Sequence, residues 1–145
     1  MRESGDPLIV RVRMPLDEHP SQRNLMDKLL GYRNIVDVPN SISVVPDAVA
    51  ATINLIEMGF GGIFNMVNPG TMTHRELIEM YEKISDTEIK KSYIDEKQLR
   101  RITKAPRSNC ILSTHKLERA GIKLRPIKEA AEDVLRQHWA RRQAA

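Results

Sequence analysis

The segment of residues 8–12, "LIVRV", most constrains how this chain folds. It is short, rich in β-branched residues and preceded by Pro7, so the pattern predicts a buried strand. Its apolar residues fall on both faces, which is typical of a central strand in a parallel sheet. Such a strand needs further strands beside it and covering layers on both faces.

Helical patterns alternate with strand patterns along the rest of the chain, which predicts the α/β class. Ser21 is expected to cap the first helix, and Pro46 lies in the first turn of the second. Residues 73–76, "THRE", form the capping box of the third. Further strands are expected at residues 62–68 and 89–94. A short helix is expected at residues 96–103, and a long helix is expected from Pro126 onward. With 145 residues, the whole chain is one domain.

Helical spacing also predicts which side chains face the core. In the second helix the expected stripe is Val49, Ile53 and Ile56. In the last helix it is Ile127, Ala131, Val134, Leu135 and His138. The final residues, "ARRQAA", are expected to fray. We expect the nearby arginines to form a solvated helix end rather than a nucleic-acid contact; these are Arg136, Arg141 and Arg142.

The amino-acid composition narrows the classes of function that are expected for the chain. Aromatic residues make up only 4% of the chain, which argues against a surface that stacks several bases or sugar rings. The net charge of +4 suits acidic small molecules such as nucleotides as well as it suits nucleic acid. The single cysteine, Cys110, cannot form an internal disulfide, so we expect a cytoplasmic protein. No apolar run approaches membrane-spanning length, and no membrane association is expected.

Two apparent motifs lie in the wrong context. Residues 59–62, "GFGG", follow a helix and precede a strand, the reverse of a phosphate-binding turn, so they are expected to end a helix. Tyr93 and Lys97 have the spacing of a dehydrogenase proton-transfer pair, but Tyr93 lies at the end of a short strand, which indicates coincidence. The four histidines and Cys110 show no metal-ligand spacing, and His74 is expected to face solvent.

Four segments together carry a family resemblance. They are "RVRMP" at residues 11–15, "NIVDVPNSISVVPD" at 34–47, "GIFNMVNPGTMTHRELIEMY" at 62–81 and "APRSNCILSTHKL" at 105–117. In sequence and order they resemble the C-terminal part of nucleotide-rhamnose synthesis enzymes. These are the 3,5-epimerase/4-reductases and the related dTDP-4-dehydrorhamnose reductases, which are extended short-chain dehydrogenases. The resemblance covers residues 8 to 135.

The resemblance implies a fold, ligands and site residues. The chain would supply late strands of a Rossmann-type sheet and the small C-terminal portion that binds a UDP- or dTDP-linked sugar. Met14 and Pro15 would lie near the nicotinamide of NAD or NADP. Asn24 and Leu25 would begin a helix beside the substrate nucleotide. The loop with Arg107, Ser108 and Asn109 would bind the substrate, with Arg107 facing its diphosphate.

The chemistry of residues 105–109, "APRSN", agrees with this implication but does not require it. A guanidinium group can hold a phosphate with two hydrogen bonds, and Pro106 restricts the backbone just before Arg107. The alternative is a plain turn whose arginine pairs with a local carboxylate or carbonyl. The sequence leaves both interpretations open.

The chain departs from the family in having neither a Gly-rich dinucleotide loop nor a Tyr-Lys pair in its proper place. By resemblance the N-terminal cofactor-binding half is absent, and the chain is expected not to catalyse alone. It is then a truncation, a fragment or one subunit of a split enzyme, and its partner is that missing half or a second copy. An assembly module that oligomerises is the alternative function, and a nucleic-acid-binding domain is a weaker one suggested only by charge.

Overall fold

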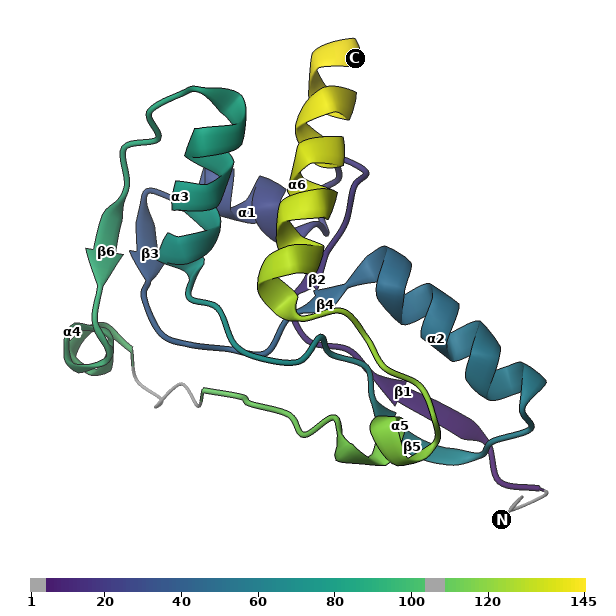
Figure 1. Cartoon of the computed structure of the whole chain (residues 1–145). Coiled ribbons are helices and arrows are strands. Elements are labelled where there is room, and N and C mark those ends of the chain that lie inside the picture. Colours follow the sequence, from purple (N-terminus) through teal and green to yellow (C-terminus); the bar gives the residue numbers. More distant parts are fainter. Residues whose placement is uncertain (1–4, 104–108) are drawn as a thin grey trace.

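The computed structural model describes residues 5–103 and 109–145 (Figure 1). The elements follow one another as β1 (Leu8–Arg11), β2 (Pro15–Leu16), α1 (Leu25–Gly31), β3 (Asn34–Val36), β4 (Ser43–Val44), α2 (Val45–Glu57), β5 (Gly62–Asn65), α3 (His74–Ser85), β6 (Ser92–Ile94), α4 (Glu96–Ile102), α5 (His115–Arg119) and α6 (Ile127–Ala144). Strands and helices are mixed along the chain, as the alternating patterns predict.

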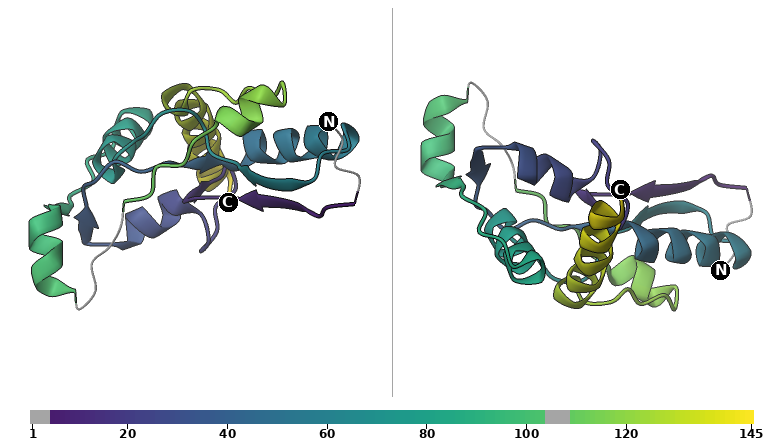
Figure 2. Two further views of the ribbon diagram at one scale, coloured as in Figure 1. Left: turned by 90° about the horizontal axis from the view of Figure 1, so that it is seen from below. Right: turned by 90° about the horizontal axis from the view of Figure 1, so that it is seen from above.

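The strands form three separate two-stranded parallel sheets, β1–β5, β2–β4 and β3–β6. The β1–β5 and β3–β6 sheets lie at opposite ends of the molecule, with α6 between them (Figures 1 and 2). Helix α2 connects β4 to β5 and packs beside the β1–β5 sheet (Figure 1). Parallel strands joined through helices confirm the predicted α/β class.

Two hydrophobic cores hold the chain together. The first core lies between α1, α3 and α6 and includes Leu29, Leu77, Ile78 and Leu135. Trp139 packs against it, with its ring edge-on to that of Tyr81 at a centroid distance of 5.9 Å. The second core joins the β1–β5 sheet to α2 and α5; its members include Ala51, Leu55, Phe64 and Leu117. The buried stripe predicted for the last helix is confirmed in full.

The predicted stripe of α2 is wrong. Val49, Ile53 and Ile56 are exposed, and the helix buries Ala48, Ala51 and Leu55 instead. The small side chains of the two alanines allow the helix to approach the sheet closely, whereas the bulky β-branched side chains point away from it. Strand β1 shows the same asymmetry, because Ile9 and its register partner Ile63 are exposed while Val10 packs on the second core.

Four helix ends test the local predictions. The capping box is confirmed, since the Thr73 and Glu76 side chains each bond to the other's backbone amide. Ser21 is not the cap of α1; Asn24 is, and its side chain accepts from the Met26 amide. The expected frayed tail is also wrong, because α6 continues to Ala144. The glycines after α2 do end the helix, as Gly59 has a φ of 72°.

Candidate functional site

A cavity of about 410 Å³ lies between α1, β3 and the turn that follows the carboxyl end of β1. Met14 and Pro15 form one side, and Leu25 and Leu29 of α1 line the apolar part. Ligands of open α/β sheets bind outside the carboxyl ends of the strands, so this position is the one that the fold favours. Met14 turns the chain there with a φ of 46°, a conformation that is uncommon for residues other than glycine.

Charged and aromatic side chains surround the mouth of this cavity. Arg23 and Lys28 line it and are exposed, as is Tyr32 at the end of α1. Two cations beside an apolar pocket favour a ligand that combines negative charge with a flat or apolar part. The sequence does not predict these three residues, because Arg23 and Lys28 lie five residues apart with Asp27 between them and form no recognisable cluster.

His74 lies on the opposite side of the cavity, at the first turn of α3. It is buried, and its Nδ1 lies 3.1 Å from the carbonyl oxygen of Val36. The prediction that His74 faces solvent is therefore wrong. The helix start turns toward β3 in the tertiary structure, and a single sequence carries no sign of that.

Asn24 lies behind the cavity wall. Its side chain is almost fully buried and makes four hydrogen bonds: the oxygen accepts from the amides of Asp17 and Met26, and the nitrogen donates to the carbonyls of Asp17 and His19. These bonds fix the turn that leads into α1. Asn24 thus shapes the wall, while its neighbour Leu25 lines the cavity itself.

The segment that follows the "APRSN" motif is attached to residues 40–41. The backbone amide of Cys110 donates to Oδ1 of Asn40, Ser41 donates to the Cys110 carbonyl, and Leu112 donates to Oγ of Ser41. Oδ1 of Asn40 also accepts from the guanidinium of Arg13. Asn109 is exposed, whereas Arg107 and Ser108 lie outside the described residues. Asn40 therefore connects three of the loops that carry the family resemblance.

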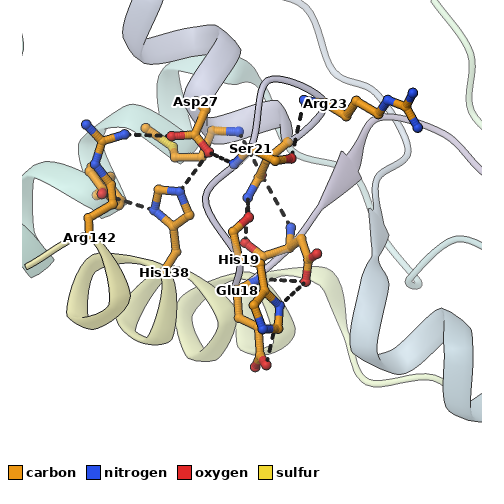
Figure 3. Close-up of polar contacts among 11 residues, drawn as sticks. Glu18, His19, Ser21, Arg23, Asp27, His138 and Arg142 are labelled. Atoms are coloured by element: carbon orange, nitrogen blue, oxygen red, sulfur yellow. Dashed lines mark hydrogen bonds and ion pairs between the residues drawn. The ribbon is translucent and has the colours of Figure 1, made fainter. Parts of the chain in front are cut away.

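A polar cluster lies on the other side of α1 (Figure 3). Nε2 of His138 is 3.0 Å from Oδ2 of Asp27, and its Nδ1 is 3.1 Å from the Tyr81 hydroxyl. Arg142 donates to Oδ1 of Asp27 at 2.6 Å. Burial favours the neutral form of Asp27, but hydrogen bonds from His138, the Ser21 amide and Arg142 outweigh it and hold the pKa of Asp27 below its ordinary value.

Tyr93 has an environment unlike that of a proton-transfer residue. It lies in β6 beneath the guanidinium of Arg75, at 4.2 Å from the ring centroid. Burial, followed by nearby carboxylates, raises the pKa of Tyr93, whereas a proton-transfer tyrosine needs a lowered one. This supports the interpretation of its spacing to Lys97 as coincidence.

The described parts of the chain contain neither a metal-binding cluster nor a membrane-spanning helix. Among residues 5–103 and 109–145, no three His, Cys, Asp or Glu side chains gather in a way that can hold a metal ion. Within the same ranges, no helix has the length and apolar character needed to cross a bilayer.

Comparison with known proteins agrees with the resemblance. No family model matches the chain. It is 35% identical over 123 residues to the bifunctional dTDP-4-dehydrorhamnose 3,5-epimerase/dTDP-4-dehydrorhamnose reductase of Arabidopsis thaliana, covering 83% of this chain and 40% of that protein. It is 30% identical over 131 residues to a trifunctional UDP-glucose 4,6-dehydratase/UDP-4-keto-6-deoxy-D-glucose 3,5-epimerase/UDP-4-keto-L-rhamnose-reductase of the same plant, covering 90% of this chain and 20% of that protein.

Solved structures share the fold. The UDP-rhamnose synthase of Acanthamoeba polyphaga mimivirus has a TM-score of 0.82 and 27% identity, over 92% of this chain and 47% of that one. The dTDP-4-dehydrorhamnose reductase of Bacillus anthracis, in complex with NADP, has a TM-score of 0.69 and 15% identity, over 88% of this chain and 46% of that one. Each of these proteins is more than twice as long as the part that the chain matches.

Parallel strands, their connecting helices and these neighbours define the class as the α/β fold of extended short-chain dehydrogenases. Within that class, the chain is a homologue of one part of the nucleotide-rhamnose synthesis enzymes.

Proposed function

We propose that this chain is the nucleotide-sugar-binding portion of an NAD(P)-dependent 4-keto-6-deoxy-sugar nucleotide reductase/epimerase, and that it does not catalyse alone. The cavity beside Met14 and Leu25 carries this proposal, because it joins an apolar wall to a cationic mouth at the carboxyl end of β1. The activities for which the relatives are named, which act on UDP- or dTDP-linked sugars, supply the substrate class.

Two parts of a UDP- or dTDP-sugar have counterparts in the cavity. The diphosphate faces Arg23 and Lys28, and by resemblance the loop with Arg107, Ser108 and Asn109 supplies a further cation. The flat base packs against apolar and aromatic side chains at the end of α1. Leu25 takes part directly, while Asn24 holds the backbone that presents it.

NAD or NADP, when bound, supplies or accepts the hydride of the reaction. Met14 and Pro15 fit one end of this cofactor, because they lie just beyond the carboxyl end of β1 and form a wall rather than a polar cradle. Their place is beside the nicotinamide ring. The Gly-rich turn that holds the pyrophosphate of a dinucleotide has no counterpart in this sequence, so that part of the cofactor needs another polypeptide segment.

The exposed apolar surface indicates where that segment binds. Strand β1 pairs with β5 on one edge, and in the β1–β5 sheet Ile9 and Ile63 are exposed on the face opposite the second core. Parallel sheets are normally covered on both faces. We propose that the cofactor-binding half of the enzyme extends the sheet from β1 and covers these side chains. A non-catalytic module that dimerises through another surface, the exposed stripe of α2, is the second candidate.

Calorimetric titration of UDP and dTDP into the full chain tests the proposal. We expect binding that weakens in Lys28→Ala and is unchanged in Lys123→Ala, an exposed lysine outside the cavity. We also expect no NADPH oxidation by the chain alone. Absence of nucleotide binding, both by the chain alone and with a cofactor-binding half from a relative added, overturns the proposal. A stable dimer without nucleotide affinity favours the assembly module.

A further inference from the structure

The end of α6 contacts the segment that forms one wall of the cavity. Arg141 donates to Glu18 at 2.9 Å. Arg142 donates to Asp27 at 2.6 Å, and His138 lies 3.0 Å from the same carboxylate (Figure 3). These contacts join residues more than a hundred positions apart in the sequence. The prediction that Arg141 and Arg142 belong to a solvated helix end is therefore wrong, because both make tertiary contacts.

The contacted segment depends on such support. Residues 17–24 contain no helix or strand, and α1 has only 7 residues, which is too short to be stable without tertiary contacts. Asp27 links the two parts, because the carboxylate that binds α6 also accepts from the Ser21 backbone amide at 2.9 Å. One side chain thus holds the helix and the preceding turn in a fixed relation to α6.

The same segment carries residues that line the cavity. Arg23 lies in the turn, and Leu25 and Lys28 lie on α1, one on each side of Asp27 in the sequence. A displacement of α1 moves the apolar wall and both cations together. The position of α1 therefore determines the distance between these groups and the rest of the cavity lining, such as Met14 and His74.

The attachment is buried at its centre and exposed at its edge. His138 is fully buried, the Asp27 side chain is 14% exposed, and that of Arg142 is 42% exposed. When the proton of the neutral imidazole is on Nε2 and faces Asp27, Nδ1 accepts the hydrogen bond of the Tyr81 hydroxyl. The ring is thereby held from two helices, so the carboxylate of Asp27 has a defined place to bind.

We propose that the end of α6 is a clamp, formed by His138, Arg141 and Arg142, that positions the Arg23–Lys28 wall of the ligand cavity. His138, Arg142 and their acceptor Asp27 are positioning residues: they touch no ligand and act through α1. This inference rests on the proposed function for its ligand, and it adds that the C-terminal helix sets the affinity of a site that it does not line.

A matched pair of arginines on α6 tests the clamp. Arg142 pairs with Asp27 across the structure, whereas Arg136 pairs with Glu132 within the helix at the same distance of 2.6 Å. Arg142→Ala is expected to weaken UDP binding about two- to fivefold, the range for a single partly exposed ion pair. Arg136→Ala is expected to leave it unchanged, and Arg142→Lys, which keeps the charge, to restore part of the loss.

Hydrogen exchange of the ligand-free chain provides a readout that does not depend on UDP. Arg142→Ala is expected to speed amide exchange in residues 17–31, relative to Arg136→Ala, and to leave the second core unchanged. Equal exchange in the two variants over residues 17–31 overturns the clamp, whatever the ligand result. If the wild-type chain binds no UDP, either alone or with a cofactor-binding half added, the proposed function of the cavity fails, while the exchange data still decide whether α6 positions its wall.

Discussion

The guanidinium of Arg13 donates to Oδ1 of Asn40 at 3.0 Å, and the same oxygen accepts the backbone amide of Cys110 at 3.2 Å. One buried amide thus joins the turn after β1 to the segment that follows residues 105–108. The first belongs to the proposed cofactor side of the site and the second to the proposed substrate side. Asn40 also forms a backbone bridge with Met72, so the junction is held from several directions.

Replacement of Asn40 by alanine is expected to destabilise the fold. The substitution leaves the Cys110 amide and the Arg13 guanidinium without their acceptor, and each buried unsatisfied group costs about 1–3 kcal/mol. We expect a total loss of roughly 2–4 kcal/mol in the free energy of unfolding, measured by urea denaturation. Asn54→Ala, at an exposed position of α2, is the control and is expected to change stability by less than about 0.5 kcal/mol.

Arg107→Ala separates the two interpretations of the "APRSN" segment. If Arg107 holds a diphosphate, the variant is expected to bind UDP about ten- to a hundredfold more weakly, the worth of a charge-assisted bidentate contact. Lysine is expected to recover part of the loss because it keeps the charge without the planar fork. Titration calorimetry measures the affinity, and melting without ligand provides the control. Unchanged affinity with a lower melting temperature indicates a plain turn.

Acid is expected to weaken the fold partly through Asp27. The pKa of Asp27 is lower in the folded chain than its ordinary value of 3.8, so its contribution to stability is fully present above that value. It is lost as the pH falls from about 4 through the folded pKa, because protonation removes the acceptor of His138 and Arg142. Urea denaturation of wild type and Asp27→Asn across this window is expected to show a shallower acid dependence in the variant. Identical slopes contradict this assignment.

The outward stripe of α2 is expected to control association rather than folding. Ile53→Glu places a charge on an exposed position and is expected to change the free energy of unfolding by less than about 0.5 kcal/mol while reducing self-association. Leu55→Ala, two residues further along α2 and in the buried row, is expected to cost about 2–5 kcal/mol. Sedimentation measures the first effect and denaturation the second. Unchanged association in Ile53→Glu excludes this stripe as an interface.

Features with a local physical cause were predictable from the sequence. The capping box at Thr73 depends on residues three apart, and the stripe of α6 on a regular spacing around Val134. For α2, spacing identified a real apolar row, but periodicity does not say which row the rest of the chain covers. The side chains of Ala48 and Ala51 are too small to identify their side of the helix as the buried face from the sequence.

The clamp and the cavity depend on contacts between distant parts of the sequence. Arg142 meets Asp27 and Arg141 meets Glu18 only because α6 crosses the segment before α1. No local pattern distinguishes such arginines from those of a solvated helix end. The resemblance, in contrast, did lead to Met14, Pro15 and Leu25, which lie together on the cavity. The ligand-binding roles of these residues, and of Asn24, Arg107, Ser108 and Asn109, stay predictions.

The position of Trp139 gives the protein a built-in optical reporter. It is the single tryptophan of the chain, it follows His138 directly, and its ring packs edge-on against Tyr81 in the first core. Emission excited selectively at the indole therefore follows the surroundings of α6 and is insensitive to the phenylalanine side of the molecule around Phe64. Opening of the half that holds the clamp changes the fluorescence spectrum of Trp139. Loosening confined to the β1–β5 half leaves that spectrum unchanged.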